Sequence, residues 1–220
     1  MNISGIVKSS LIDFPGLISC VLFVPGCNFD CFYCHNRSLI DGSHIILTPH
    51  CVMDFLQRRA GLLDGVVISG GEPTLQSDLI PFIEALKGLG YRIKLDTNGS
   101  RPKIVGKLLE RKLCDYFAVD YKAPSARYSE FCGEGSDPGR VIETIRLLSE
   151  NDVPFEVRTT VIPQLGHEEL VMMAREIPKV PRYVLNRYKM PEKYLQKDAE
   201  RVRERPYSQE EIQSLAAGIA

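Results

Sequence analysis

The chain has 220 residues, 44% of them apolar and 25% charged, a composition that excludes a disordered or fibrous protein. Its 27 basic and 28 acidic residues leave a net charge of −1, so nucleic acid is not the expected partner. The first residues lack a secretory-signal pattern, and no apolar run reaches the roughly 18 residues that a membrane span needs. We therefore expect a cytoplasmic protein with no membrane partner.

Short β-branched apolar runs alternate with helical segments about six times along the chain. The expected strands are Ser19–Val24, Gly65–Ser69, Arg92–Asp96, Asp115–Asp120, Phe155–Val161 and Arg182–Leu185. Strands that alternate with helices in this way imply right-handed crossovers and a parallel sheet covered by helices. The pattern alone leaves both a partial barrel and an open doubly wound sheet possible. We expect one domain spanning residues 1–220.

Helix boundaries carry their own signals in this sequence. The expected N-caps are Thr48, Asp137 and Ser208, the last paired with Glu211 in a capping box, and Gly88 and Gly90 mark one helix end. The helix before these glycines has an apolar stripe formed by Leu79, Phe82, Ile83, Leu86 and Leu89. Charges of both signs crowd the segment Lys189–Arg205, which favours a solvated helix or lid over a binding surface.

The seven cysteines are an odd number, and a reducing compartment favours metal or redox chemistry over disulfides. Four of them are scattered singly and are expected to be small buried apolar residues: Cys20, Cys51, Cys114 and Cys132. The other three, Cys27, Cys31 and Cys34, fall within eight residues directly after the first expected strand. Three thiolates this close raise one another's pKa unless a metal neutralises them, so we expect a metal centre.

Two kinds of metal centre fit this spacing. A structural zinc ion takes four ligands, and the nearest fourth candidate, His35, is adjacent to Cys34, which makes chelation by both awkward. An iron–sulfur cluster held by three thiolates instead leaves one iron open to another ligand. A zinc-stabilised binding module without catalysis is thus the alternative to an iron–sulfur enzyme.

Polar residues follow several expected strands, where parallel α/β folds place their chemistry. They include Lys94, Asp96, Thr97, Asn98, Asp120, Lys122 and Arg158. A structural set of salt bridges is the other explanation for these residues. Gly70-Gly71-Glu72-Pro73 directly follows the second expected strand, and paired glycines let backbone approach a ligand closely. Taken alone, this tetrapeptide is better explained as a tight strand-to-helix turn.

The three-cysteine motif of residues 27–34, followed by Gly70-Gly71-Glu72-Pro73, resembles the radical S-adenosylmethionine (SAM) family. Within that family, four further segments resemble the glycyl-radical-enzyme activating proteins: Asp13–Gly16, Cys34–Asn36, Asp96–Gly99 and Val119–Lys122. The opening Leu11–Gly16 is most similar to activating proteins of the anaerobic ribonucleoside-triphosphate reductase. The resemblance covers about residues 6–188.

The resemblance implies a partial (β/α)6 TIM-like barrel with the cluster-binding loop after the first strand. It assigns Cys27, Cys31 and Cys34 to a 4Fe-4S cluster whose fourth iron is chelated by S-adenosyl-L-methionine. The residues that it places around this cofactor are Tyr33, Asn36, Gly70, Gly71, Glu72, Pro73, Thr97, Asn98, Lys122 and Arg158. Tyr33 is expected near the adenine or, alternatively, packed under the loop. A monovalent-cation site at Asp96 and Asp120 is also implied.

The activity implied is reductive cleavage of SAM to a 5'-deoxyadenosyl radical, which removes hydrogen from a glycine Cα on a large glycyl radical enzyme. The expected partner is an anaerobic ribonucleotide reductase, and no side chain need act as general acid or base. No second cysteine cluster is present, so an external donor such as flavodoxin or ferredoxin is expected. Phe14 departs from the pyruvate formate-lyase branch. Another glycyl radical enzyme, a small molecule, an RNA or a peptide are the alternative substrates.

Overall fold

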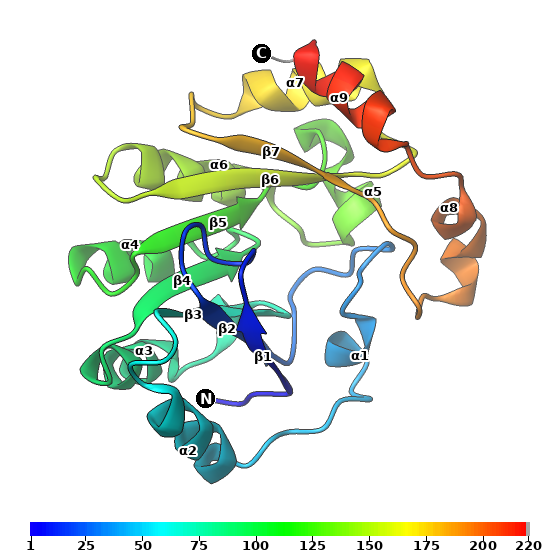
Figure 1. The fold of residues 1–220 in the computed structure, drawn as a ribbon. Helices are drawn as coiled ribbons and strands as arrows, with labels where there is room; N and C mark the ends of the chain where they lie inside the picture. Colours follow the sequence, from blue (N-terminus) through cyan, green and yellow to red (C-terminus); the bar gives the residue numbers. More distant parts are fainter. Residues whose placement is uncertain (219–220) are drawn as a thin grey trace. The chain divides into compact units, whose positions relative to one another are not determined.

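The computed structural model describes residues 1–218 and contains seven strands and nine α-helices within them (Figure 1). The strands are β1 (Gly5–Ser10), β2 (Ser19–Val24), β3 (Gly65–Gly70), β4 (Arg92–Thr97), β5 (Tyr116–Asp120), β6 (Phe155–Val161) and β7 (Tyr183–Arg187). The helices are α1 (Arg37–Ile40), α2 (Pro49–Arg59), α3 (Leu79–Gly88), α4 (Pro102–Glu110), α5 (Tyr128–Cys132), α6 (Pro138–Ser149), α7 (His167–Glu176), α8 (Ala199–Arg203) and α9 (Gln209–Ala217). No helix among the described residues is long and apolar enough to cross a membrane.

The strands form one sheet in chain order, from β1 to β7. The pairs β2–β3, β3–β4 and β6–β7 are parallel, whereas β1 pairs antiparallel with β2. Because β1 and β7 are the edge strands of the order, the sheet is open in residues 1–218. The predicted α/β architecture with a partial, unclosed parallel sheet is confirmed.

The six expected strands correspond to β2 through β7, and β1 was not predicted. Its residues are all partly buried or exposed, and Gly5–Ser10 lacks the long apolar run that identified the others. With β1 in place, the cysteine motif follows the second strand of the chain, which is the first of the parallel strands.

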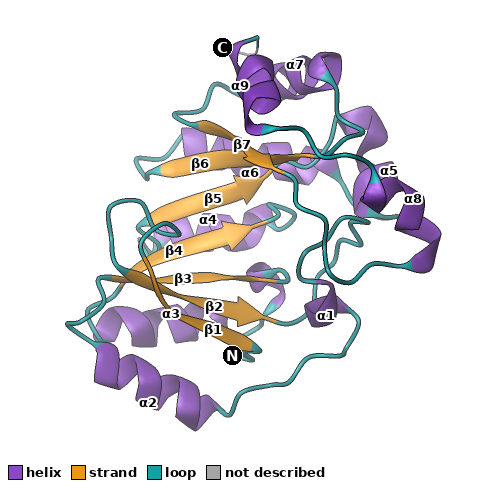
Figure 2. Cartoon of the chain, turned by 45° about the vertical axis from the view of Figure 1, so that its right-hand side comes forward, coloured by secondary structure: helices purple, strands orange, loops and turns teal. Residues whose placement is uncertain are grey.

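The chain divides into two compact units. One consists of Met1–Asn28, Ser38–Thr97 and Lys103–Ala118, and the other of Phe29–Arg37, Asn98–Pro102 and Val119–Ala220. In the first unit, α2 and α3 lie beside the strands β1 to β4 (Figure 2), and α3 buries Leu79, Ile83 and Leu86 of its predicted stripe. In the second unit, α7 and α9 lie next to each other and α9 contacts β7 (Figure 1).

The predicted helix caps are all present. The Thr48 hydroxyl accepts from the N–H of Cys51, the Asp137 carboxylate accepts from Gly139, and Ser208 and Glu211 form the reciprocal capping box of α9. Helix α3 ends at Gly88, and Gly90 takes a φ of 87°, which a side chain would disfavour.

The capping box of α9 predicts a pH dependence of stability. The Glu211 carboxylate accepts hydrogen bonds from the Arg205 side chain, which has the larger effect, and from the Ser208 N–H. Together they lower the pKa of Glu211 to about 2. A carboxyl group whose pKa is lower in the folded than in the unfolded chain stabilises the folded state at any pH above its ordinary pKa. This stabilisation is lost as the pH falls from the ordinary pKa towards the pKa in the folded state. The difference in melting temperature between the wild type and E211Q should therefore shrink as pH falls from 5 to 3. A constant difference would contradict this role of the charge.

Three of the four scattered cysteines are buried as expected: Cys20, Cys114 and Cys132. Burial raises the pKa of the Cys20 thiol to about 11. The prediction for Cys51 was wrong, because this residue is exposed in the first turn of α2. The buried face of that helix carries Val52 and Leu56, four residues apart, and Cys51 lies off this stripe.

Candidate cofactor site

The second half of the cysteine motif forms a tight turn in the second unit. The Cys34 N–H donates to the Cys31 carbonyl at 3.1 Å, and the backbone N–H of Asn36 donates to the Cys34 thiol. The Asp30 N–H, on the other side, donates to the Cys132 carbonyl at 2.8 Å. These backbone bonds fix the path of the loop that carries the two thiols.

The two thiols of this turn differ in their surroundings. A hydrogen bond with the buried Cys132 thiol lowers the pKa of Cys31. Burial is the main effect on Cys34 and raises the pKa of its thiol. Sequence reasoning placed Cys132 among the scattered cysteines and missed its position, because nothing in the residues around it indicates a contact 101 positions away in the chain.

The aromatic residues between these thiols are buried. Phe32 and Tyr33 are 6% and 5% exposed, and their rings meet edge to face at 5.1 Å. Tyr33 also faces the ring of Tyr188 at 6.4 Å, and its hydroxyl lies 3.4 Å from the Lys122 carbonyl. Tyr33 is thus packed among aromatic rings, and its expected place near the adenine stays a prediction.

In the first unit, the turn after β3 is joined to the chain directly before Cys27. The Glu72 N–H donates to the Gly26 carbonyl at 2.7 Å, and the Gly71 N–H donates to the Val24 carbonyl at 2.8 Å. Gly70 has a φ of 114°, and a Cβ on Gly71 would lie 1.9 Å from the Gly26 carbonyl oxygen. Both glycines are thus required by the close approach of two backbone segments.

The Glu72 side chain is completely buried and joins this turn to the end of β4. Its Oε1 accepts from the hydroxyl of Thr97 at 2.7 Å, and from the N–H and hydroxyl of Thr74 at 3.0 and 2.5 Å. Pro73 begins a single 3₁₀ turn that Glu72 caps. The structure therefore brings together Glu72 and Thr97, two residues that the sequence assigned separately to cofactor binding.

The hydroxyl of Thr97 should matter for stability because it satisfies a buried charge. Thr97→Val removes one donor from the carboxylate, and hydrogen bonds to charged groups contribute about 1.5–3 kcal/mol, so we expect a loss of about 2 kcal/mol in unfolding free energy. Thr97→Ser keeps the hydroxyl and should retain most of this stability. Urea unfolding of the two variants checks the prediction, and equal midpoints would contradict it.

At the end of β4, Asp96 is paired within the first unit. The Nζ of Lys94, a side chain only 3% exposed, lies 2.7 Å from an Asp96 carboxylate oxygen, and the Ser69 hydroxyl donates to the other at 3.3 Å. The carboxylate that was predicted to hold a monovalent cation thus has a protein cation as its neighbour.

A second acidic residue, at the end of β5, has two such neighbours in the second unit. Asp120 lies 3.0 Å from Lys122 Nζ and 3.0 Å from Arg158 Nε. Burial raises the pKa of this carboxyl, but attraction by the two cations outweighs burial and holds the pKa at about 2. The structure therefore joins three predicted site residues into one ion-paired group, which is the alternative explanation given for such strand-end residues.

Asn98 shapes the loop that follows β4. The side-chain oxygen of this buried residue accepts from the Ser100 N–H at 3.0 Å, and the Thr144 hydroxyl donates to the Gly99 carbonyl at 2.6 Å. Gly99 takes a φ of 72°, where an added Cβ would meet Val119 and Val141. The conformation of this loop therefore depends on the Asn98 side chain, on the hydrogen bond from Thr144 and on the positive φ of Gly99.

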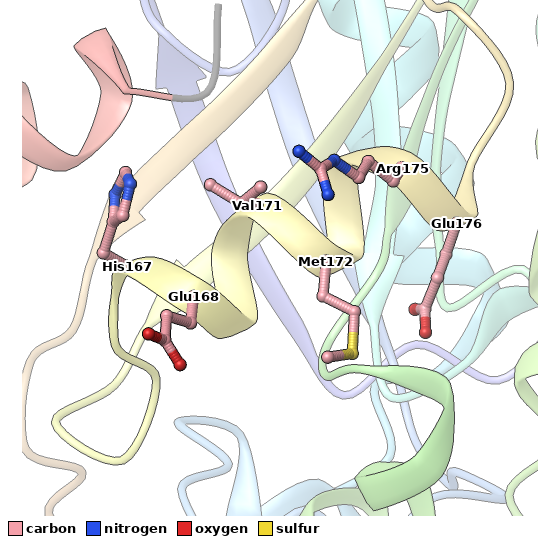
Figure 3. A pocket seen from close by; sticks show the side chains of 6 residues that line it. All are labelled: His167, Glu168, Val171, Met172, Arg175 and Glu176. Atoms are coloured by element: carbon pink, nitrogen blue, oxygen red, sulfur yellow. The ribbon is translucent and has the colours of Figure 1, made fainter.

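A hollow of about 390 Å³ lies elsewhere in the second unit, along α7 (Figure 3). Figure 3 shows its lining side chains, which are His167, Glu168, Val171, Met172, Arg175 and Glu176. None of them is a predicted site residue. Because a single helix supplies the whole lining, the hollow is a surface feature separate from the cysteine loop.

Comparison with known proteins identifies the family of the chain. Residues 21–177 match the model of the radical SAM superfamily. A protein of Methanocaldococcus jannaschii, provisionally named a glycyl-radical enzyme activating enzyme, is 35% identical over 201 residues, which are 87% of this chain and 82% of the relative. The chain belongs to the radical SAM superfamily.

Two solved structures share the radical SAM fold. A domain of pyruvate-formate lyase-activating enzyme from Bacteroides vulgatus aligns with 70% of this chain and 92% of its own, at a TM-score of 0.52 and 22% identity. Streptococcus suis SuiB, solved with S-adenosylmethionine bound, aligns with 90% of this chain and 47% of its own, at a TM-score of 0.63 and 18% identity. At these identities the likeness concerns the fold.

Membership in the radical SAM superfamily implies a 4Fe-4S cluster and S-adenosylmethionine, and the donor set of the chain fits them. Three reduced cysteines lie within eight residues, and two of them sit in one hydrogen-bonded turn. Cys27 belongs to the first unit and the other two to the second. No group of three or more His, Cys, Asp or Glu side chains in residues 1–218 is gathered around a common metal position.

Proposed function

We propose that this radical SAM enzyme is an activase that generates a glycyl radical on an anaerobic ribonucleoside-triphosphate reductase. The observation that carries the activase assignment is the 35% identity, over 87% of the chain, to a relative provisionally named a glycyl-radical enzyme activating enzyme. The choice of reductase rests on the opening Leu11–Gly16 and is the finer part of the proposal.

Cys27, Cys31 and Cys34 would each lose the thiol proton and hold the cluster through the resulting thiolate. When bound, the reduced cluster supplies one electron that cleaves SAM into methionine and a 5'-deoxyadenosyl radical. The Cys31–Cys34 turn keeps two ligands at a fixed spacing, and the buried Phe32 and Tyr33 exclude water from that turn.

The remaining residues bind and orient the cofactor in this proposal. Gly70 to Pro73 would present backbone to the methionyl amino group, and Glu72 keeps that turn attached to Thr97. Lys122 and Arg158 would meet the ribose and carboxylate. Tyr33, Asn36 and Asn98 complete the proposed surroundings. No general acid or base is required.

Anaerobic reconstitution with iron, sulfide, dithionite and SAM tests the enzyme directly. We expect 5'-deoxyadenosine and methionine in equal amounts, measured by chromatography. Adding the reductase should produce a glycyl radical signal in electron paramagnetic resonance, and a reductase whose radical glycine is replaced by alanine is the matched control.

The two measurements separate the alternatives. Absence of 5'-deoxyadenosine from protein with an intact cluster would refute the radical chemistry. Formation of 5'-deoxyadenosine without a glycyl radical on the reductase would refute the proposed partner and point to another glycyl radical enzyme, a small molecule, an RNA or a peptide. Replacing dithionite by flavodoxin or ferredoxin then tests the expected electron donor. A zinc module without catalysis has no support from a chain that belongs to an enzyme superfamily.

Three further expectations stay predictions. They are a single radical SAM domain over residues 1–220, a cytoplasmic location, and a monovalent-cation site at Asp96 and Asp120. A cation at this site would have to displace, or share a carboxylate with, Lys94 at Asp96 and both Lys122 and Arg158 at Asp120. Titration of activity with potassium or sodium measures its contribution.

A further inference from the structure

The second half of the cysteine loop is contacted by the charged segment near the C-terminus, which the sequence predicted as a solvated helix or lid. Helix α8 of that segment buries Ala199 and Val202, and Asp198 before it is 8% exposed. Glu200 and Arg203 of this helix are exposed, so it is solvated on one face while Ala199 and Val202 pack on the other. Residues 188–203 are called the C-terminal strap below.

The first two residues of the strap, Tyr188 and Lys189, contact the cysteine loop. The Tyr188 ring lies 6.4 Å from the rings of both Tyr33 and His35, and the His35 ring is hydrogen-bonded to the backbone of Lys189. Tyr188 is itself 1% exposed, and its hydroxyl donates to the Val202 carbonyl at 2.8 Å. The beginning and end of the strap are thereby tied together against the cysteine loop.

Arg201 makes the most direct contact. Its guanidinium carbon lies 3.9 Å from the centre of the Phe32 ring, in the sequence interval between Cys31 and Cys34, and 5.7 Å from that of Phe131. A guanidinium over an aromatic face is attracted by the ring quadrupole, and partial removal from water strengthens the attraction. The Arg201 side chain is about one-third exposed.

The position of Arg201 is fixed from several sides. Its carbonyl accepts from Gln164 Nε2 at 2.9 Å, and its Nη2 lies 3.4 Å from a Glu130 carboxylate oxygen. Glu130 is also bound through both oxygens by Arg127, which stacks on Phe131 at 4.6 Å. This network holds the guanidinium on Phe32.

We propose that the C-terminal strap, through the stack of Arg201 on Phe32, is a positioning device that holds the Cys31–Cys34 turn ready to ligate the cluster. The strap lies beyond residues 21–177, where the superfamily model ends. Arg201 acts through Phe32 and is a positioning residue. The proposal rests on the proposed function, since it concerns the loop assigned to the cluster.

Arg203 provides a matched control on the same helix. It also stacks on an aromatic ring, that of Tyr194 at 5.8 Å, and donates to the Tyr194 hydroxyl at 2.9 Å. Arg201→Ala and Arg203→Ala therefore remove the same kind of side chain and the same kind of contact from α8. Only the first removes a contact with the cysteine loop.

The first measurement is amide hydrogen exchange of residues 29–37 in the metal-free chain. Arg201→Ala should speed exchange of the Asp30 and Cys34 amides about tenfold, within the range of a cation–π contact, and Arg203→Ala should stay within about twofold of the wild type. Arg201→Lys keeps the charge but loses the planar group, so its rate should fall between the two.

The second measurement is the rate of iron release to a chelator from reconstituted protein without SAM. Arg201→Ala should lose iron about tenfold faster than the wild type, as removal of support around a metal ligand does. A rate within about twofold of the wild type in either measurement, or an equal effect of Arg203→Ala, would overturn the proposal.

Two results are kept apart by this design. If the wild type takes up no cluster, the proposed function fails, and hydrogen exchange alone still decides whether the strap holds the loop. If Arg201→Ala does not fold, the pair Arg201→Lys and Arg203→Lys replaces it, with an expected difference of about threefold in exchange of the loop amides. Equal exchange in that pair would overturn the proposal.

Discussion

Replacing Cys31 by alanine should leave the anaerobically reconstituted protein without its iron–sulfur absorbance. Loss of a residue around a metal ligand lowers metal affinity about 10- to 100-fold, and loss of the ligand itself should reach at least about 100-fold. Production of 5'-deoxyadenosine should disappear with the cluster. Iron and sulfide content per chain, together with the visible spectrum, measure the effect.

Cys51→Ala is the control for this replacement. Cys51 is an exposed thiol on α2, outside the motif, and the variant should bind the same amount of iron as the wild type. Iron content in Cys31→Ala equal to that of Cys51→Ala would exclude Cys31 as a ligand. Repeating the replacement at Cys27 and Cys34 extends the test to the whole motif.

Replacing Gly71 by alanine should have the largest effect on folding. The added Cβ would lie 1.9 Å from the Gly26 carbonyl oxygen and 2.7 Å from its carbon, and backbone atoms cannot move aside as a flexible side chain can. Overpacking commonly costs 1–3 kcal/mol and sometimes more, so we expect a loss of about 3 kcal/mol or more in unfolding free energy. Chemical unfolding measures it, and loss of soluble protein would be its extreme form.

Gly106→Ala is the matched control in the same unit. Gly106 lies within α4, where an added Cβ would meet nothing within 4 Å. Alanine in a helix interior should raise stability by up to about 1 kcal/mol. If Gly71→Ala proves as stable as Gly106→Ala, the close approach of the two backbone segments does not exist in solution. If only Gly71→Ala also loses iron, the turn supports the loop that begins with Cys27.

The elements recognised from the sequence were those whose signals are local. The strand Gly65–Gly70 begins with four consecutive buried residues that include Val66, Val67 and Ile68, and the capping box of Ser208 and Glu211 spans four residues. Strand β1 escaped because its residues have no buried apolar face. The strand forms through hydrogen bonds to β2, and this pairing is not encoded in the local pattern of residues 5–10.

The candidate site divides in the same way. The cysteines and the Gly70–Pro73 turn are contiguous motifs, so their place after successive parallel strands could be predicted. Arg201 is one of many charges in its segment, and its stack on Phe32 joins residues 169 positions apart. The hydrogen bond between Cys31 and Cys132 is equally non-local. No pattern of spacing reveals such contacts, since they depend on tertiary packing.

The ion pairs of Asp120 reduce the electrostatic attraction that Lys122 and Arg158 can offer to an incoming anion. Lys122 and Arg158 already face an internal counter-ion at 3.0 Å each. The free energy gained by an incoming carboxylate would therefore be the difference between its new ion pairs with these cations and the existing pairs with Asp120. The cost of moving both cations away from Asp120 reduces this gain further. Two cations against one carboxylate leave this group a single net positive charge, so Asp120 halves the charge that attracts an incoming anion, and shape and reach then carry more of the selectivity for one anion over another.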